Sequence, residues 1–169
     1  MKKLRVILFL FIGQPLIAQQ PIDKGFKLNW KTPIGITTYR TNMIFYKGSI
    51  FIGTNGKERN SLTDTQDGVY QLDAKSGKIL HHFQTPFMGD NDVTGIAIAD
   101  NKLFFGTDNF TFFCYDLNTK KELWKRRTPF DVESAPVTED FNQDGLKDVF
   151  FPVEGNGFYA LSGLDGSTL

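Results

Sequence analysis

Short runs of apolar residues alternating with polar ones recur along the chain after residue 20, and Gly, Asn and Asp bound each run. This pattern is typical of β-strands, and no segment after residue 20 has the spacing of an amphipathic helix. One stretch predicts four strands, at residues 95–99, 102–107, 111–116 and 122–126. The pairs Asp100-Asn101 and Asp108-Asn109 between them are expected in tight turns, because both residue types tolerate positive φ.

The runs are organised as a repeat with three copies. The cores of the copies begin at Gly68, Thr111 and Gly157, which are 43 and 46 residues apart. Each copy is interpreted as four antiparallel strands in about 40–45 residues, the size of one β-propeller blade. The sequence therefore predicts an all-β fold, a β-propeller of four-stranded antiparallel blades with about two and a half blades present. A β-sandwich is the alternative, but matched residues at matched offsets in three places argue against it.

Each copy contains variants of one motif, an aromatic residue followed by x-Leu-Asp and then by Ser/Thr-Gly-Lys-x-Leu-Trp. The first copy has Tyr70, Leu72, Asp73 and Gly77, with His81 where the ring is expected. The second has Lys120 in place of the glycine and keeps Trp124, and the third has Ser162 in place of the aspartate and keeps Gly166. The unit resembles the pyrroloquinoline-quinone-type (PQQ-like) propeller repeat over roughly residues 26–169. That resemblance implies a parent ring of about eight blades, and the repeat occurs in enzymes and scaffolds alike.

The first residues have the layout of a secretory signal peptide, residues 1–18. A basic start with Lys2, Lys3 and Arg5 is followed by a short apolar run and by Ala18 as the last residue removed. A membrane anchor is the alternative, but the run is shorter than the ~20 residues that span a bilayer. We therefore expect a bacterial protein that is periplasmic or secreted, with no transmembrane segment after cleavage.

The repeat divides the remaining chain into predicted segments. Residues 19–25 are a linker, and residues 26–33 echo the end of the second copy and are expected to form the outer strand of a closing blade. The blades are predicted at 34–86, 87–129 and 130–169. Since the last motif stops before its outer strand, we expect an N-terminal fragment of a longer propeller.

Composition and charge refine this interpretation. The 169 residues carry no net charge, and cleavage of the leader would leave 16 basic and 19 acidic residues, so nothing indicates nucleic acid as a partner. The 17 Phe residues are expected to fill the wedges between blades. Leu103 and Phe105 on one strand, and Phe112 and Cys114 on the next, are predicted to face neighbouring blades. Cys114, the single cysteine, is expected to be buried.

One motif carries metal chemistry. The loop 140–148 places oxygen donors at Asp140, Asn142, Asp144 and Asp148, Gly145 permits a sharp turn, and Leu146 offers its carbonyl. The loop resembles the calcium-binding loop of FG-GAP/VCBS repeats, which are also propeller repeats. Three carboxylates on nine residues would repel one another without a cation, so we predict a structural Ca²⁺ site rather than an Asx-rich turn without metal.

A second set of polar residues precedes the first strand of each blade. These are Tyr39 and Arg40, then 90–92, then 131–133. Because that strand lines the channel of a propeller, they are candidates for a polar channel mouth, but the sequence favours plain loop residues.

Three functional classes remain open. The favoured one is an exported, non-enzymatic scaffold that binds a protein, a small ligand or a glycan at the propeller face. The alternatives are part of a quinoprotein (PQQ-dependent) dehydrogenase and a polysaccharide-binding or adhesion propeller. No catalytic residue is identified, and this segment gives no support for bound PQQ, because the lone Cys114 cannot form the vicinal disulfide that this class implies.

Overall fold

The computed structural model describes residues 28–57, 62–86 and 89–169, which form three antiparallel sheets. The predicted signal peptide, the linker and the first two residues of the predicted closing strand lie outside the described residues. The strands of the first sheet are β1 (Met43–Tyr46), β2 (Ser49–Thr54), β3 (Gly68–Asp73) and β4 (Ile79–Gln84). Those of the second are β5 (Ile96–Ala99), β6 (Lys102–Thr107), β7 (Thr111–Asp116) and β8 (Glu122–Arg127). The third contains β9 (Val137–Glu139), β10 (Asp148–Val153) and β11 (Gly157–Leu161).

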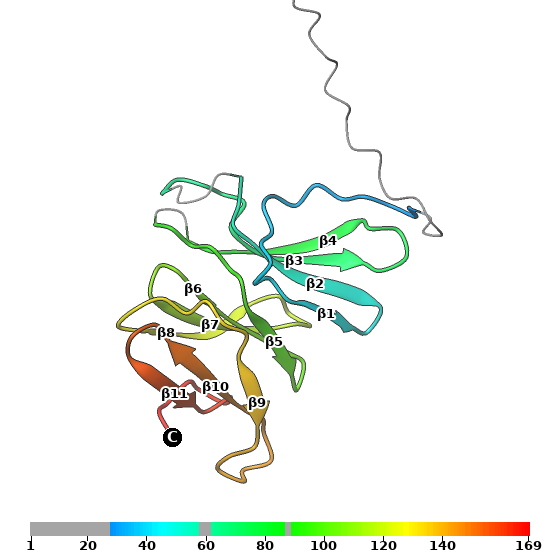
Figure 1. Cartoon of the computed structure of the whole chain (residues 1–169). Helices are drawn as coiled ribbons and strands as arrows, with labels where there is room; N and C mark the ends of the chain where they lie inside the picture. Colours follow the sequence, from blue (N-terminus) through cyan, green and yellow to red (C-terminus); the bar gives the residue numbers. More distant parts are fainter. Residues whose placement is uncertain (1–27, 58–61, 87–88) are drawn as a thin grey trace, which may run out of the picture.

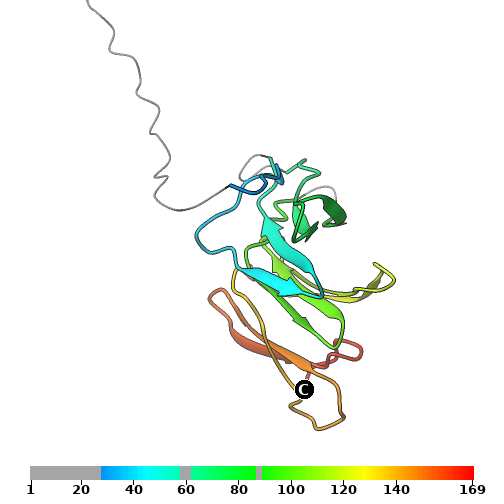
Figure 2. The same ribbon diagram turned by 90° about the vertical axis from the view of Figure 1, so that its right-hand side faces the viewer.

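Neighbouring strands in each sheet are consecutive in the sequence, as in a propeller blade. Figures 1 and 2 show the sheets stacked in chain order, with the second sheet between the first and the third. The all-β fold and the partial propeller predicted from the repeat are confirmed. The strands predicted in the second copy match β5 to β8 to within one residue at each end.

Positive φ angles test the two predicted turns of the second sheet. Asp100 and Asn101 have φ values of 46° and 60°, as predicted for the β5–β6 hairpin. The β6–β7 turn has three residues, and its positive φ of 53° falls on Phe110 rather than on Asp108 or Asn109. Asp108 and Asn109 therefore lie in a tight turn as predicted, but the left-handed conformation falls at the last position of this three-residue hairpin loop.

Aromatic side chains fill both spaces between sheets. Phe51, Phe83, Leu103, Phe105 and Phe113 belong to one buried cluster. Phe104, Phe112, Cys114, Trp124 and Phe151 belong to another. Successive strand residues point to opposite faces, so β6 and β7 supply both clusters, as the alternation of Leu103 and Phe105 with Phe112 and Cys114 predicted. The rings of Phe112 and Phe151 stack with centroids 3.9 Å apart, which joins the second sheet to the third.

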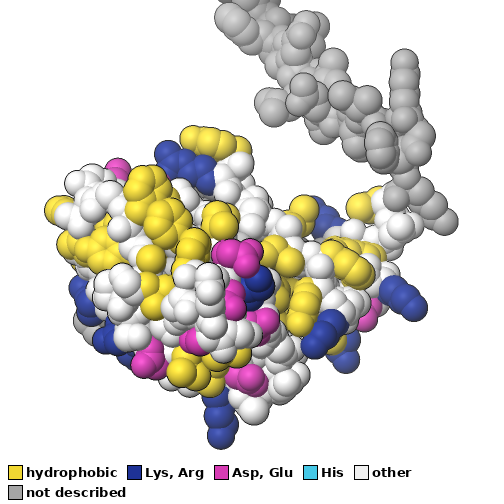
Figure 3. All heavy atoms as spheres, turned by 90° about the horizontal axis from the view of Figure 1, so that it is seen from below, with side chains coloured by type: hydrophobic (Ala, Val, Ile, Leu, Met, Phe, Trp, Pro, Cys, Tyr) yellow, Lys and Arg dark blue, Asp and Glu magenta, His cyan; other side chains and the backbone are white. Residues whose placement is uncertain are grey.

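The outward face of the third sheet is also aromatic. The rings of Phe150 and Phe158 stack with centroids 5.4 Å apart, and Phe158 is 69% exposed. The view from below the third sheet shows hydrophobic side chains spread over the surface among charged ones (Figure 3). Within the part of the chain that the structure describes, no fourth sheet covers this face.

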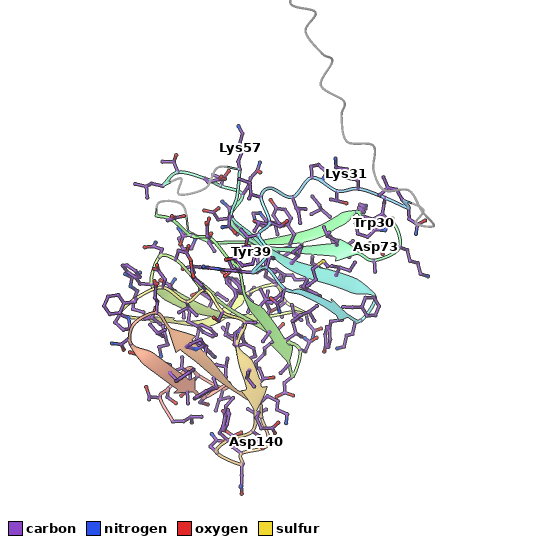
Figure 4. The ribbon with its side chains drawn as sticks, in the orientation of Figure 1. Trp30, Lys31, Tyr39, Lys57, Asp73 and Asp140 are labelled. Atoms are coloured by element: carbon purple, nitrogen blue, oxygen red, sulfur yellow. The ribbon has the colours of Figure 1, made fainter. Side chains whose placement is uncertain are left out.

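Each tryptophan binds the β-turn of a neighbouring blade. The indole nitrogen of Trp124, on β8, donates to the carbonyl of Gly163 at 3.5 Å. That of Trp30 donates to the carbonyl of Ala74 at 3.3 Å, in the equivalent turn of the first sheet, and Trp30 lies beside Asp73 (Figure 4). Residues 28–33 form no strand, because no described strand pairs with them. Their assignment as an outer strand stays a prediction, although Trp30 occupies the place that such a strand would give it.

Over the described ranges 28–57, 62–86 and 89–169, no helix has the length and apolar character needed to cross a membrane.

Candidate functional site: a polar pocket shared by three blades

Loops from all three blades meet at one end of the sheets. Consecutive strands of each blade are antiparallel, so the connection between its second and third strands lies at the same end of the sheet as the start of its first strand. The β2–β3 and β6–β7 connections therefore lie at the same end of the sheets as the segments that lead into β5 and β9. Lys57 lies in the β2–β3 connection and Asp140 lies between β9 and β10, and Figure 4 shows the two residues far apart, one in the first blade and one in the third. The leading segments bind the preceding sheet, since Val93 donates its backbone N–H to Thr54 at 3.0 Å and Val132 donates to Thr107 at 3.3 Å. This pairing brings polar residues of successive blades together.

A cavity of about 270 Å³ opens among these loops, and we call it the three-blade pocket. Its lining residues are mostly polar: Thr38, Tyr39, Arg40, Asn55, Asp92, Thr94, Asp108 and Glu133. The guanidinium of Arg40 forms an ion pair with Glu133, which links the first blade to the third. Arg40 is the one basic residue among these lining residues, so the remaining lining charge is acidic.

Three aspartates of the second blade lie close together, and we call them the acidic cluster; two of them, Asp92 and Asp108, line this pocket. One carboxylate oxygen each of Asp90, Asp92 and Asp108 lies within 4.8 Å of the other two. Asp92 is 3% exposed and accepts a hydrogen bond from the Asn55 side-chain amide at 2.6 Å, yet its Oδ1 has no partner. Oδ1 of Asp90 and of Asp108 is likewise buried without a partner.

Burial and mutual repulsion set the protonation of the cluster. Burial, followed by the charges of Asp90 and Asp67, raises the pKa of Asp92 to about 7. Burial, followed by the charges of Asp92 and Glu133, raises the pKa of Asp108 to about 8. Removing a carboxylate from water disfavours its charged form, and nearby like charges add to that cost. The cluster is therefore poor in compensating positive charge.

The sequence analysis named some of the residues that line this pocket but favoured a plain loop role for them. Tyr39, Arg40, residues 90–92 and residues 131–133 were interpreted as plain loop residues, whereas Tyr39, Arg40, Asp92 and Glu133 line one cavity. Asn55 and Asp108 were missed. Both follow a Gly-Thr pair at the end of the second strand of a blade, so the repeat alignment carries a signal for them.

The predicted calcium-loop residues lie at the opposite end of the third sheet. The Asp140 carboxylate accepts the backbone N–H groups of Asp144 at 3.1 Å and Gly145 at 3.0 Å, and the Asn142 amide donates to Asp144 at 3.0 Å. Leu146 is in the same loop, and its N–H donates to Asp144 at 2.8 Å. Asp140, Asn142, Asp144 and Leu146 are thus brought together in one exposed loop.

Asp148 has different surroundings. It is fully buried beneath the loop, and its Oδ2 accepts the N–H groups of Phe141 at 2.9 Å and Asn142 at 3.2 Å. Its Oδ1 accepts the N–H of Gly163 at 3.1 Å. Both oxygens therefore hold backbone, and calcium binding by this loop stays a prediction.

Four-stranded antiparallel sheets, stacked through aromatic wedges and joined by short connections, define the class of protein as a β-propeller repeat protein. Residues 69–169 match the family model described as outer membrane protein assembly factor BamB. The match covers more than half of the chain, and the chain belongs to this family of PQQ-like repeat proteins.

Similar proteins include dehydrogenases and an assembly factor. The chain is 30% identical over 134 residues to a quinoprotein ethanol dehydrogenase of Pseudomonas aeruginosa, covering 78% of this chain and 20% of that protein. The chain thus spans about a fifth of the length of the curated relatives it matches.

Two solved structures share the fold at low sequence identity. BamB from Moraxella catarrhalis aligns with a TM-score of 0.53 and 14% identity, over 75% of this chain and 33% of that one. The quinohemoprotein alcohol dehydrogenase ADHIIG from Pseudomonas putida HK5 aligns with a TM-score of 0.52 and 16% identity, over 75% of this chain and 19% of that one. At this level of identity the likeness concerns the fold alone.

Proposed function

We propose that this chain is part of an exported, non-enzymatic β-propeller scaffold that binds a protein or small ligand at the three-blade pocket. The observation that carries this proposal is the pocket itself, because residues of three blades converge on one open cavity. Tyr39 at this pocket is 93% exposed, so a large amphipathic ring is available for contact.

The charge of the pocket favours a cationic or neutral polar ligand group. Asp92, Asp108 and Glu133 supply acidic groups, while Arg40 is already paired with Glu133. Complementary charge steers association and rejects like-charged partners. A nucleic acid, with its phosphate backbone, is therefore disfavoured at this face, whereas a basic or amide-rich protein segment fits.

A quinoprotein dehydrogenase is the second candidate, because the curated relatives near 30% identity have that name. Pyrroloquinoline quinone carries three carboxylates, and Arg40, the one basic residue that lines the three-blade pocket, is already paired with Glu133, so no unpaired basic lining residue is available to bind them. The described residues do not fit the quinone at this pocket by themselves. This mismatch is why we favour a scaffold over an enzyme.

Export and the calcium loop belong to the same proposal. The family description, which names an outer membrane assembly factor, and the secretory layout of the first residues support a periplasmic or secreted location. Ca²⁺ held by Asp140, Asn142, Asp144 and Leu146 would keep the β9–β10 loop in one conformation. The role of Asp148 would then be to hold the loop backbone from below, since it already accepts three N–H groups.

Site-specific photocrosslinking in the producing cell tests the scaffold proposal. A photoreactive amino acid at Tyr39 is expected to yield a discrete protein adduct outside the cytoplasm, and Glu133→Lys, which replaces an acidic lining residue by a basic one, should reduce it. The matched control is the same probe at Leu164, which is 61% exposed in a turn of the third blade away from the pocket. Equal adducts at both positions, or none from Tyr39, would contradict protein binding at the pocket. Dye-linked ethanol oxidation after reconstitution with quinone would favour the dehydrogenase instead.

A further inference from the structure

The acidic cluster has the donor set of a cation site. Carboxylate oxygens of Asp90, Asp92 and Asp108 lie within 4.8 Å of one another, and each residue keeps a buried oxygen without a hydrogen-bond partner. The Asp90 and Asp92 side chains can hydrogen-bond to each other when one of them is protonated. Oδ1 of Asp108 has no such partner, and a buried polar atom without a partner needs an explanation. A positive charge among the three carboxylates would supply it.

Asn55 gives an independent observation from the neighbouring blade. Its side chain is 7% exposed, and its amide nitrogen donates to Asp92 at 2.6 Å. Its side-chain oxygen is also buried without a partner, and Asn55 lines the same pocket as Asp92 and Asp108. An amide oxygen is a neutral donor typical of hard-cation sites. Its lack of a partner therefore points to a ligand rather than to chance crowding of acids.

We propose that Asp90, Asp92 and Asp108, together with the side-chain oxygen of Asn55, bind a divalent cation, with Ca²⁺ preferred. All four donors are oxygens, which selects hard cations over zinc or copper. Two oxygens on one Ca²⁺ ion are at most about 5 Å apart, whereas two on Mg²⁺ are at most about 4.2 Å apart. The carboxylate oxygens of the cluster all lie within 4.8 Å of one another, which is close enough for one Ca²⁺ ion to bind them together.

This site is separate from the predicted calcium loop and does not depend on partner binding. The donors come from the first and second blades, whereas the loop 140–148 belongs to the third and lies at the opposite end of its sheet. A cation here would join the first two blades across Asn55 and Asp92. It would also neutralise acidic charge in the three-blade pocket.

Calcium titration of the full chain, with the loop disabled by Asp140→Asn and Asp144→Asn, tests the proposal. In this background, Ca²⁺ is expected to raise the midpoint of thermal unfolding by about 5 °C or more, and Mg²⁺ by less. Adding Asp92→Asn and Asp108→Asn should raise the midpoint without metal, because like charges are removed, and abolish the calcium shift. Asp165→Asn, at an exposed turn of the third blade, is the matched control and should leave the shift unchanged.

Calorimetric titration measures Ca²⁺ binding directly, so the proposal can still be tested when a variant is too unstable for a thermal unfolding experiment. Asp90→Asn, the mildest change because Asp90 is only half-buried, should weaken Ca²⁺ binding at least tenfold in the loop-disabled background. No heat or thermal shift at about 10 mM Ca²⁺, above the range of weak extracellular sites, would overturn the proposal. A calcium shift that survives in the Asp92→Asn and Asp108→Asn variant would also overturn it.

Discussion

Trp124 of the second blade rests directly on Gly166 of the third. A Cβ added at Gly166 would lie 2.7 Å from Cε3 of the indole, closer than real contacts allow. Trp30 has the same relationship with Gly77 of the first blade, where an added Cβ would lie 2.4 Å from Cε3. The glycine of the repeat motif is therefore a docking surface for the tryptophan of the neighbouring blade.

Gly166→Ala is expected to destabilise the chain through this contact. The residue has a φ of 71°, which costs about 1 kcal/mol for alanine, and displacing the indole should add about 1–3 kcal/mol. Gly155→Ala is the matched control, because Gly155 has a φ of 62° but open space around its Cβ position. Urea unfolding measures the difference, and equal losses for both variants would refute the docking role.

The junction between the first and second blades lacks this tryptophan–glycine pair. His81 of the first blade stands where the motif has tryptophan, and Lys120 of the second blade stands where it has glycine. Lys120 keeps a positive φ of 61°, donates to the Gln71 side chain at 2.6 Å and lies over the Phe83 ring at 5.4 Å. We predict that His81→Trp with Lys120→Gly restores the docking found at Trp124. The double variant should exceed the sum of the single variants by about 1 kcal/mol in unfolding free energy, measured by a double-mutant cycle. Strict additivity would mean that the two positions do not interact.

Asp67 should make the metal-free chain less stable as pH rises. Burial, followed by the charge of Asp64, raises its pKa from 3.8 to about 6. The folded state therefore holds this proton more tightly than the unfolded state, so the stabilisation is complete below pH 3.8 and is lost as pH passes about 6. Asp67→Asn should flatten the fall in unfolding free energy over that window, measured by urea unfolding with a chelator present.

Asp116→Asn is the control for that pH series. Hydrogen bonds from Thr119 lower the pKa of Asp116, so its contribution has the opposite sign and is lost as pH falls. An unchanged slope in Asp67→Asn would rule out Asp67 as its source.

Substitutions at Asp148 and at Asp140 are expected to have different effects, one on the structure of the 140–148 loop and the other on calcium binding. Asp148→Ala leaves three backbone N–H groups without their acceptor and is expected to cost about 2–4 kcal/mol with or without calcium. Asp140→Asn should cost less without calcium and should remove only calcium-dependent stability. Thermal unfolding in calcium and in chelator measures both, and a strictly calcium-dependent loss in Asp148→Ala would contradict this division.

The parts of the fold that could be predicted from the sequence are those that the repeat motif encodes locally. Hydrogen bonding within a blade is local, so alternation and turn residues sufficed to place β5 to β8 and the Asp100-Asn101 hairpin. The positive φ at Phe110 was not predicted, because it depends on the length of the turn rather than on residue preference. Burial of Cys114 followed from its aromatic neighbours and is confirmed.

The sequence by itself determined the blades, since strand period, turn chemistry and the PQQ-like motif act over a few residues. It also located the loop 140–148, whose donors are adjacent in the chain. The three-blade pocket was decided only by the tertiary structure. Asn55, Asp92 and Asp108 meet because the segment before each inner strand pairs with the preceding blade. At Val93 and Thr54 that pairing joins residues 39 positions apart. Their buried, unpartnered oxygens exist only after the blades have stacked, because stacking is what removes water from them.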